Sequence, residues 1–151
     1  MDQWEDMEGM LDGAMKDITK RMAGIDLERI ETDALPDNGK VSALITELSG
    51  PDGITLAYNV EDALLWKIAQ GMKRRPIEDM EEAGEYAREY FNVVCGHLIS
   101  RLSRKTKAIL RFTMPEYLPH CFGEKDSKNA FVLYYRSPEG SVRVQGVYNN
   151  K

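Results

Sequence analysis

Cysteine and histidine are scarce in this chain, with two residues of each type among 151. Two cysteines, Cys95 and Cys121, do not build a disulfide framework. On a helix, Cys95 and His97 would point about 160° apart. Adjacent His120 and Cys121 would also diverge in an extended segment, so neither pair has the spacing of zinc ligands. We therefore expect no metal site, and we assign Cys95 to a buried or half-buried position.

Basic charge and long apolar runs are also lacking. The net charge of −5 and the pI near 5.1 argue against a nucleic acid partner and against anionic membranes. No apolar run approaches the roughly 18 residues that a membrane-spanning helix needs. The first six residues lack the basic and then apolar regions of a signal peptide. We therefore expect a cytoplasmic protein that binds neither nucleic acid nor membrane.

The sequence motifs of the common enzyme classes are missing as well. There is no nucleophile elbow, phosphate-binding loop, His-Glu metal motif or dinucleotide fingerprint. His97 falls on the flank of a helical pattern and His120 follows Pro119 in a loop, so neither has the setting of a catalytic triad. Self-contained catalysis of the common kinds is therefore not expected.

What the chain does contain is the patterning of one α+β domain that spans residues 1–151. Hydrophobic residues at 42% and charged residues at 30% are typical of a globular protein with a core. Apolar periodicity and turn residues predict helices at 5–23, 60–72 and 78–104, and strands at 40–48, 54–58, 108–113, 131–136 and 142–148. The segment 117–122 suits either a loop or a strand. This order indicates an antiparallel sheet packed against helices.

The segment 78–104 is the longest helical pattern, and it has two distinct faces. Apolar residues recur along one face at steps of three and four, as in a core-facing stripe: Met80, Ala83, Ala87, Phe91, Val94, Leu98 and Leu102. The opposite face carries Glu85, Glu89, Asn92, Gly96 and Ser103. We predict that this second face points away from the core.

Glu89 and Asn92 are the most informative pair on the outer face. They stand three positions apart, so on a helix their side chains are neighbours. A carboxylate beside a carboxamide can hold the cation of a partner and orient a water molecule. Gly96 lies one turn further on, although a glycine inside a helix costs roughly 1 kcal/mol relative to alanine. It either exposes backbone where another macromolecule approaches Asn92, or relieves crowding within the chain.

A longer spacing contains this pair: Glu85, three residues, Glu89, two residues, Asn92, twenty-two residues, Pro115. It resembles the signature of the CheC/CheX/FliY phosphatases of bacterial chemotaxis, in which Asp or Ser, Glu, Asn and Pro stand at these intervals. The likeness covers about residues 5–148. Glu85 departs from the usual Asp or Ser, and Tyr90-Phe91 replaces a leucine-led pair. A single Glu-x-x-Asn helix resembles CheX-like members, whereas CheC-like members often carry two.

The resemblance implies a phosphatase that acts on the acyl phosphate of a CheY-type receiver domain. In that family's chemistry Asn92 would position the attacking water, and Glu89 would pair with the active-site lysine of the receiver. Glu85, Arg88 and Gly96 would complete the partner-binding surface. The chain would need no cofactor of its own, because the receiver binds the Mg²⁺.

The sequence leaves open two alternative functions and the oligomeric state of the protein. The chain could be a non-catalytic CheX-like module that binds a receiver or another signalling protein, or an unrelated structural α+β protein. The resemblance also implies a homodimer whose sheets join, with an unpaired edge expected at the strands 131–136 and 142–148. The competing arrangement is a monomer, in which that sheet edge is protected from pairing by the charges of Lys125, Asp126 and Lys128 or is covered by the first helix.

Overall fold

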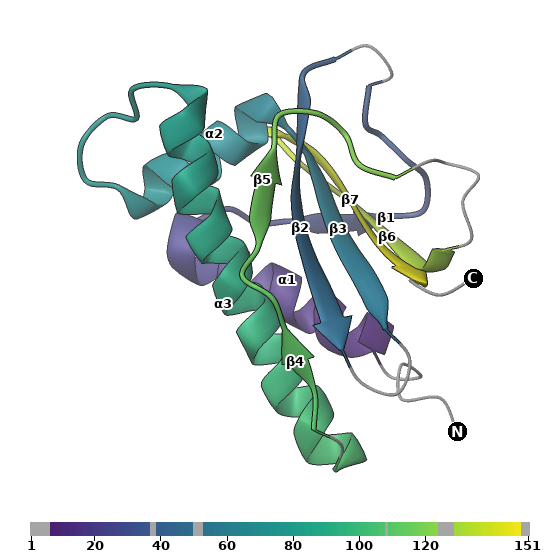
Figure 1. The fold of residues 1–151 in the computed structure, drawn as a ribbon. Helices are drawn as coiled ribbons and strands as arrows, with labels where there is room; N and C mark the ends of the chain where they lie inside the picture. The colour runs from purple at the N-terminus through teal and green to yellow at the C-terminus, as the bar shows by residue number, and fades with distance from the viewer. Residues whose placement is uncertain (1–6, 37–38, 50–52, 108, 124–128, 149–151) are drawn as a thin grey trace.

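The computed structural model describes residues 7–36, 39–49, 53–107, 109–123 and 129–148 (Figure 1). Within these residues the chain forms three helices and seven strands. Their order is α1 (Met7–Ala23), β1 (Glu28–Ile30), β2 (Val41–Ser49), β3 (Ile54–Glu61), α2 (Asp62–Met72), α3 (Met80–Thr106), β4 (Arg111–Phe112), β5 (Glu116–Leu118), β6 (Asn129–Ser137) and β7 (Gly140–Tyr148). The helices pack on an antiparallel sheet, which confirms the predicted fold class.

The strand order of the sheet is β1-β6-β7-β3-β2-β4, and β5 also pairs with β2. The short strands β4 and β5 pair with different parts of β2. β4 pairs opposite Leu48 and Ser49, whereas β5 pairs opposite 43–45. In Figure 1 the chain from β4 to β5 runs alongside α3, so one edge of the sheet and the long helix lie side by side.

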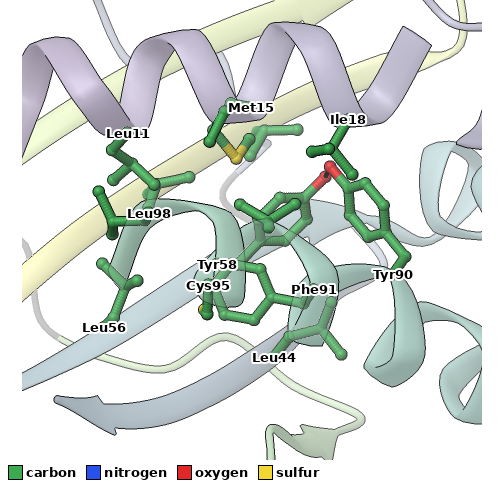
Figure 2. Close-up of a cluster of buried hydrophobic side chains, with 14 of the residues drawn as sticks. Leu11, Met15, Ile18, Leu44, Leu56, Tyr58, Tyr90, Phe91, Cys95 and Leu98 are labelled. Carbon is green, nitrogen blue, oxygen red and sulfur yellow. Dashed lines mark hydrogen bonds between the residues drawn. The ribbon is translucent and has the colours of Figure 1, made fainter. Parts of the chain in front are cut away.

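The core lies between the helices and one face of the sheet. Leu44 pairs with Tyr58, and Tyr58 pairs with Val144, so these three side chains point to the same face of the sheet. Figure 2 shows how side chains of α1 and α3 meet them: Leu11, Met15 and Ile18 come from α1, and Phe91, Cys95 and Leu98 come from α3. This packing fixes the rotation of α3 about its own axis.

The predicted elements are largely present, with changes at their ends. The three helices are confirmed, and the strands at 40–48, 54–58, 131–136 and 142–148 correspond to β2, β3, β6 and β7. The strand expected at 108–113 is only Arg111–Phe112, and 117–122 contributes only to the end of β5. β1 was not predicted, because its three residues are too few for a readable alternation.

The expectation of an open edge at the last two strands is wrong for β7. That strand lies between β3 and β6 and pairs with both. The outer side of β6 pairs with β1 from Tyr134 to Arg136. Of the last two strands, only the first half of β6 has a side that no other described strand pairs with, and β1 covers the rest. Lys125, Asp126 and Lys128, which would have blunted the edge, lie outside the described residues.

The homodimer stays a prediction, and an interface through the predicted strands would use the β6 and β1 edge of the sheet. Light scattering on the purified protein at micromolar concentration is expected to give about twice the 17.2 kDa of one chain. A mass close to one chain would show that the edge of β6 and β1 is not an interface. The candidate site below would survive that result, because its residues belong to a single chain.

Candidate functional site

The long helix α3 begins and ends at well-defined caps. The side chain of Asp79 accepts a hydrogen bond from the Glu82 amide at 2.8 Å, which satisfies one free donor of the first turn. Glu82 also accepts a hydrogen bond from Lys73, which lowers the pKa of the Glu82 carboxyl and keeps it ionised near the helix N-terminus. At the other end Lys107 adopts a left-handed conformation and donates to the Ser103 carbonyl at 2.7 Å.

The inner face of α3 is buried as predicted. The buried members of the expected stripe are Ala83, Ala87, Phe91, Val94, Leu98 and Leu102. Met80, at the start of the helix, is only partly buried. The buried face is also wider than predicted, because Tyr90 and Ile99 belong to it.

Tyr90 is the residue of this inner face that sequence reasoning missed. Its hydroxyl group bonds with Thr19 of α1 and, at 3.0 Å, with the hydroxyl of Tyr58 (Figure 2). Burial raises the pKa of Tyr90 to about 12, so this network stays protonated at neutral pH. Tyr90 therefore anchors α3 to α1 and β3 directly beside the predicted site.

The outer face of α3 presents the predicted polar residues to solvent. Glu85 and Glu89 are exposed, and Asn92 and Gly96 are half-buried. Val93 follows Asn92 and is 41% exposed, which is unusual for a large apolar side chain on this helix. The outward placement of the carboxylates is confirmed, and Asn92 lies closer to the body of the protein than the sequence indicated.

Two glycines of α3 have different reasons to be glycine. A Cβ atom on Gly96 would lie 3.8 Å from Phe112, an ordinary contact, so crowding within the chain does not require glycine there. A Cβ atom on Gly84 would lie 2.7 Å from the ring of Tyr117, too close for any real contact. Gly84 therefore serves the packing of β5 on α3, and the sequence contains no signal for it. The alternative in which Gly96 relieves internal crowding loses its support.

The structure brings two residues of the predicted site, Glu85 and Arg88, together with Pro115 of the spacing pattern in a single hollow beside α3. The Nε atom of Arg88 donates to the carbonyl of Pro115 at 2.9 Å, across 27 positions of sequence. The hollow has a volume of about 470 Å³ and is lined by Glu81, Glu85, Arg88, Met114, Pro115, Glu116 and Tyr117. Glu89, Asn92 and Gly96 continue along the helix beyond this hollow. Met114 and Tyr117 were not predicted as site residues.

A second hollow, of about 730 Å³, lies away from α3 and contains both the other cysteine and the other histidine of the chain. Its buried arginine, Arg143, donates to Asp33 at 2.7 Å, Gln145 at 2.8 Å and the sulfur of Cys121 at 3.0 Å. Because Arg143 alternates with core residues of β7, this network occupies the sheet face opposite the helices. Each of the three guanidinium nitrogens donates a hydrogen bond within the chain, so we assign the network a structural role.

The metal-ligating residue types do not gather in the described part of the chain. No group of three or more His, Cys, Asp or Glu residues there could hold a metal ion. Cys95 is buried as expected, and burial raises the pKa of its thiol, so it stays protonated. Among the described residues, no helix is long and apolar enough to span a membrane.

The fold is that of the CheX and CheC-like chemotaxis proteins. The chain superimposes on the chemotaxis protein CheX from Vibrio vulnificus with a TM-score of 0.78 at 17% identity, covering 99% of both chains. For a CheC-like superfamily protein from Shewanella sp. PV-4 the TM-score is 0.75 at 20% identity, with 99% of this chain and 100% of that chain covered.

A protein of the same fold solved in a complex is also among the structural neighbours. The CheX-CheY-BeF3-Mg²⁺ complex from Borrelia burgdorferi matches with a TM-score of 0.72 at 15% identity, covering 96% of this chain and 99% of that chain. A scan against models of known protein families and a search of curated proteins both find no significant match. The structural neighbours therefore confirm the resemblance at the level of the fold.

Proposed function

We propose that this chain is a CheX-like member of the CheC/CheX/FliY family and dephosphorylates the acyl phosphate of a CheY-type receiver domain. One observation carries the proposal: Glu89 and Asn92 lie together on the outer face of α3, in the fold of proteins that include a CheX solved with CheY, BeF3 and Mg²⁺. The alternative of an unrelated structural protein does not account for that placement.

Asn92 has the role of positioning water in this proposal. The water attacks phosphorus in line with the departing aspartate oxygen, and the P–O bond to the aspartate breaks. The receiver keeps its aspartate as a free carboxylate, and inorganic phosphate is released. The carboxamide of Asn92 offers both an acceptor for a water proton and a donor for an oxygen atom. Because phosphoryl transfer depends mainly on positioning and electrostatics, one well-placed amide is a sufficient contribution from this chain.

Glu89 has the role of docking. Its exposed carboxylate lies on the helical turn beside Asn92 and would pair with the lysine of the receiver. The pair fixes where the helix sits on the receiver and hence where Asn92 reaches the phosphoryl group. The Mg²⁺ enters with the receiver as part of the substrate, and half-buried Gly96 permits close approach of the receiver backbone to α3.

The proposal is tested by the loss of phosphate from purified phosphorylated receiver domains, with and without this protein. We expect faster dephosphorylation for at least one receiver. Binding without faster turnover would instead identify a non-catalytic receiver-binding module. If the protein neither binds nor dephosphorylates any receiver of the same genome, the assignment is wrong.

Glu89→Lys is expected to raise the Kd for the receiver by about tenfold or more, because attraction to the receiver lysine becomes repulsion. Gly96→Leu is expected to weaken binding to a similar degree by obstructing the approach. Titration calorimetry against the receiver carrying beryllofluoride and Mg²⁺ measures both effects. Glu139→Lys, the same charge change in the turn between β6 and β7, is the control and should bind as wild type. Wild-type affinity in Glu89→Lys and Gly96→Leu would mean that the receiver docks elsewhere.

A further inference from the structure

The segment from Thr113 to Tyr117, here called the strap, is fixed at its first residue to the edge of the sheet. The Thr113 amide donates to the Glu47 carbonyl at 3.1 Å, and the Glu47 amide donates to the Thr113 hydroxyl at 3.0 Å. The hydroxyl of Thr46 also bonds with that of Thr113 at 3.1 Å. The backbone on one side of Met114 is therefore held by β2.

The other end of the strap is fixed to α3. Pro115 is buried, and its carbonyl accepts the hydrogen bond from Arg88. The ring of Tyr117 packs on the bare backbone of Gly84, and its hydroxyl lies 3.3 Å from that of Ser42. The strap is thus clamped on both sides of one residue, Met114.

Met114 itself is 61% exposed, although its neighbours on both sides are anchored. Among the described residues four large hydrophobic side chains are exposed, and two of them are associated with the outer face of α3. Met114 lines the hollow that also contains Glu85 and Arg88, and Val93 follows Asn92 in the helix. Because its backbone is already held in place, Met114 would bind without a further cost for ordering the chain around it. Methionine in particular adapts its shape to the surface that it meets.

We infer that Arg88 is a positioning residue, which holds the strap against α3 so that Met114 forms an apolar contact with the receiver beside Glu89 and Asn92. This inference rests on the proposed function. It assigns to Arg88 a task within the chain, in place of the direct partner contact predicted from sequence. It also makes Met114 a residue that sets which receivers bind, because the receiver must present an apolar patch at that point.

The experiment is a double-mutant cycle on receiver binding. Arg88→Met keeps the length of the side chain as far as the Nε position and removes the donor, and Met114→Ala removes the apolar contact. Each is expected to raise the Kd for the beryllofluoride-bound receiver about tenfold, as for a single well-packed interface residue. Because Arg88 acts through Met114, the double variant should bind about as weakly as either single variant. Arg88→Lys, which restores a donor, should recover most of the affinity.

Steady-state dephosphorylation separates positioning from a general loss of structure. Arg88→Met and Met114→Ala are both expected to raise KM about tenfold and to change kcat less than twofold, since neither residue touches the reacting atoms. Additive losses in the cycle, or a fall in kcat with KM unchanged, would overturn the inference while leaving the phosphatase assignment intact. A wild-type protein that neither binds nor dephosphorylates any receiver would overturn both.

Discussion

Replacing Asn92 with alanine is expected to lower kcat for receiver dephosphorylation about 100-fold, the loss typical of removing one positioned polar group from a transition state. The side chain is half-buried on the outer face of α3 and belongs to none of the core contacts, so the variant should fold normally. The Kd for the beryllofluoride-bound receiver should change little, because Glu89 still provides the docking contact. Rapid-quench or fluorescence measurement of phosphate release gives kcat directly.

Two further variants make that experiment specific. Asn92→Gln retains the carboxamide but moves it by one methylene, so an intermediate loss is expected if position matters. Ser100→Ala alters an exposed residue further along the same helix and should leave kcat unchanged. An unchanged kcat in Asn92→Ala would remove the water-positioning role. A proportional loss of both kcat and binding would point to a damaged docking surface instead.

Phe91→Ala, one residue earlier, is expected to lower the free energy of unfolding by about 3–5 kcal/mol. The side chain is fully buried, and its ring centre lies 5.1 Å from that of Tyr58 in the centre of the core. The variant removes packing between α3 and β3 and leaves a cavity. Chemical denaturation monitored by circular dichroism measures the change.

The control for this stability prediction lies on the same helix. Val93→Ala removes apolar atoms from a side chain that is 41% exposed, so a loss of only about 0.5 kcal/mol is expected. A similar loss from both variants would contradict the assignment of inner and outer faces. At low temperature, where Phe91→Ala remains folded, its kcat should stay close to wild type, because the water-positioning amide belongs to its neighbour.

The rotation of α3 could be predicted from sequence because its apolar residues recur with the period of a helix. That pattern placed Phe91 inside and Glu89 outside, and both placements are confirmed. Tyr90 falls at the border between the two faces of the helix, and the packing of α1 through Thr19 and of β3 through Tyr58 makes it an interior residue. Whether a residue between the two faces of a helix is buried depends on the neighbouring elements, and the apolar periodicity of one helix does not reveal these.

Contacts between distant segments were beyond sequence reasoning. The spacing from Glu85 to Pro115 fits the family signature, but the hydrogen bond from Arg88 to the Pro115 carbonyl depends on how β5 returns along α3. The sequence gives no indication that Gly84 must be glycine either, because that requirement arises from the close packing of Tyr117. The two short strands that carry this chain segment were predicted least well, since few residues alternate in each.

The division of α3 into a buried face and an exposed face has an evolutionary consequence. Substitutions on the inner face are limited by the requirements of the core, whereas Glu85 and Glu89 on the outer face are exposed. Residues at such exposed positions can therefore change without first compromising the architecture. Proteins of 15–20% identity to this chain still match it with TM-scores of 0.72–0.78, so likeness of fold says little about likeness of function. Differences in function are better sought on the outer face of this helix.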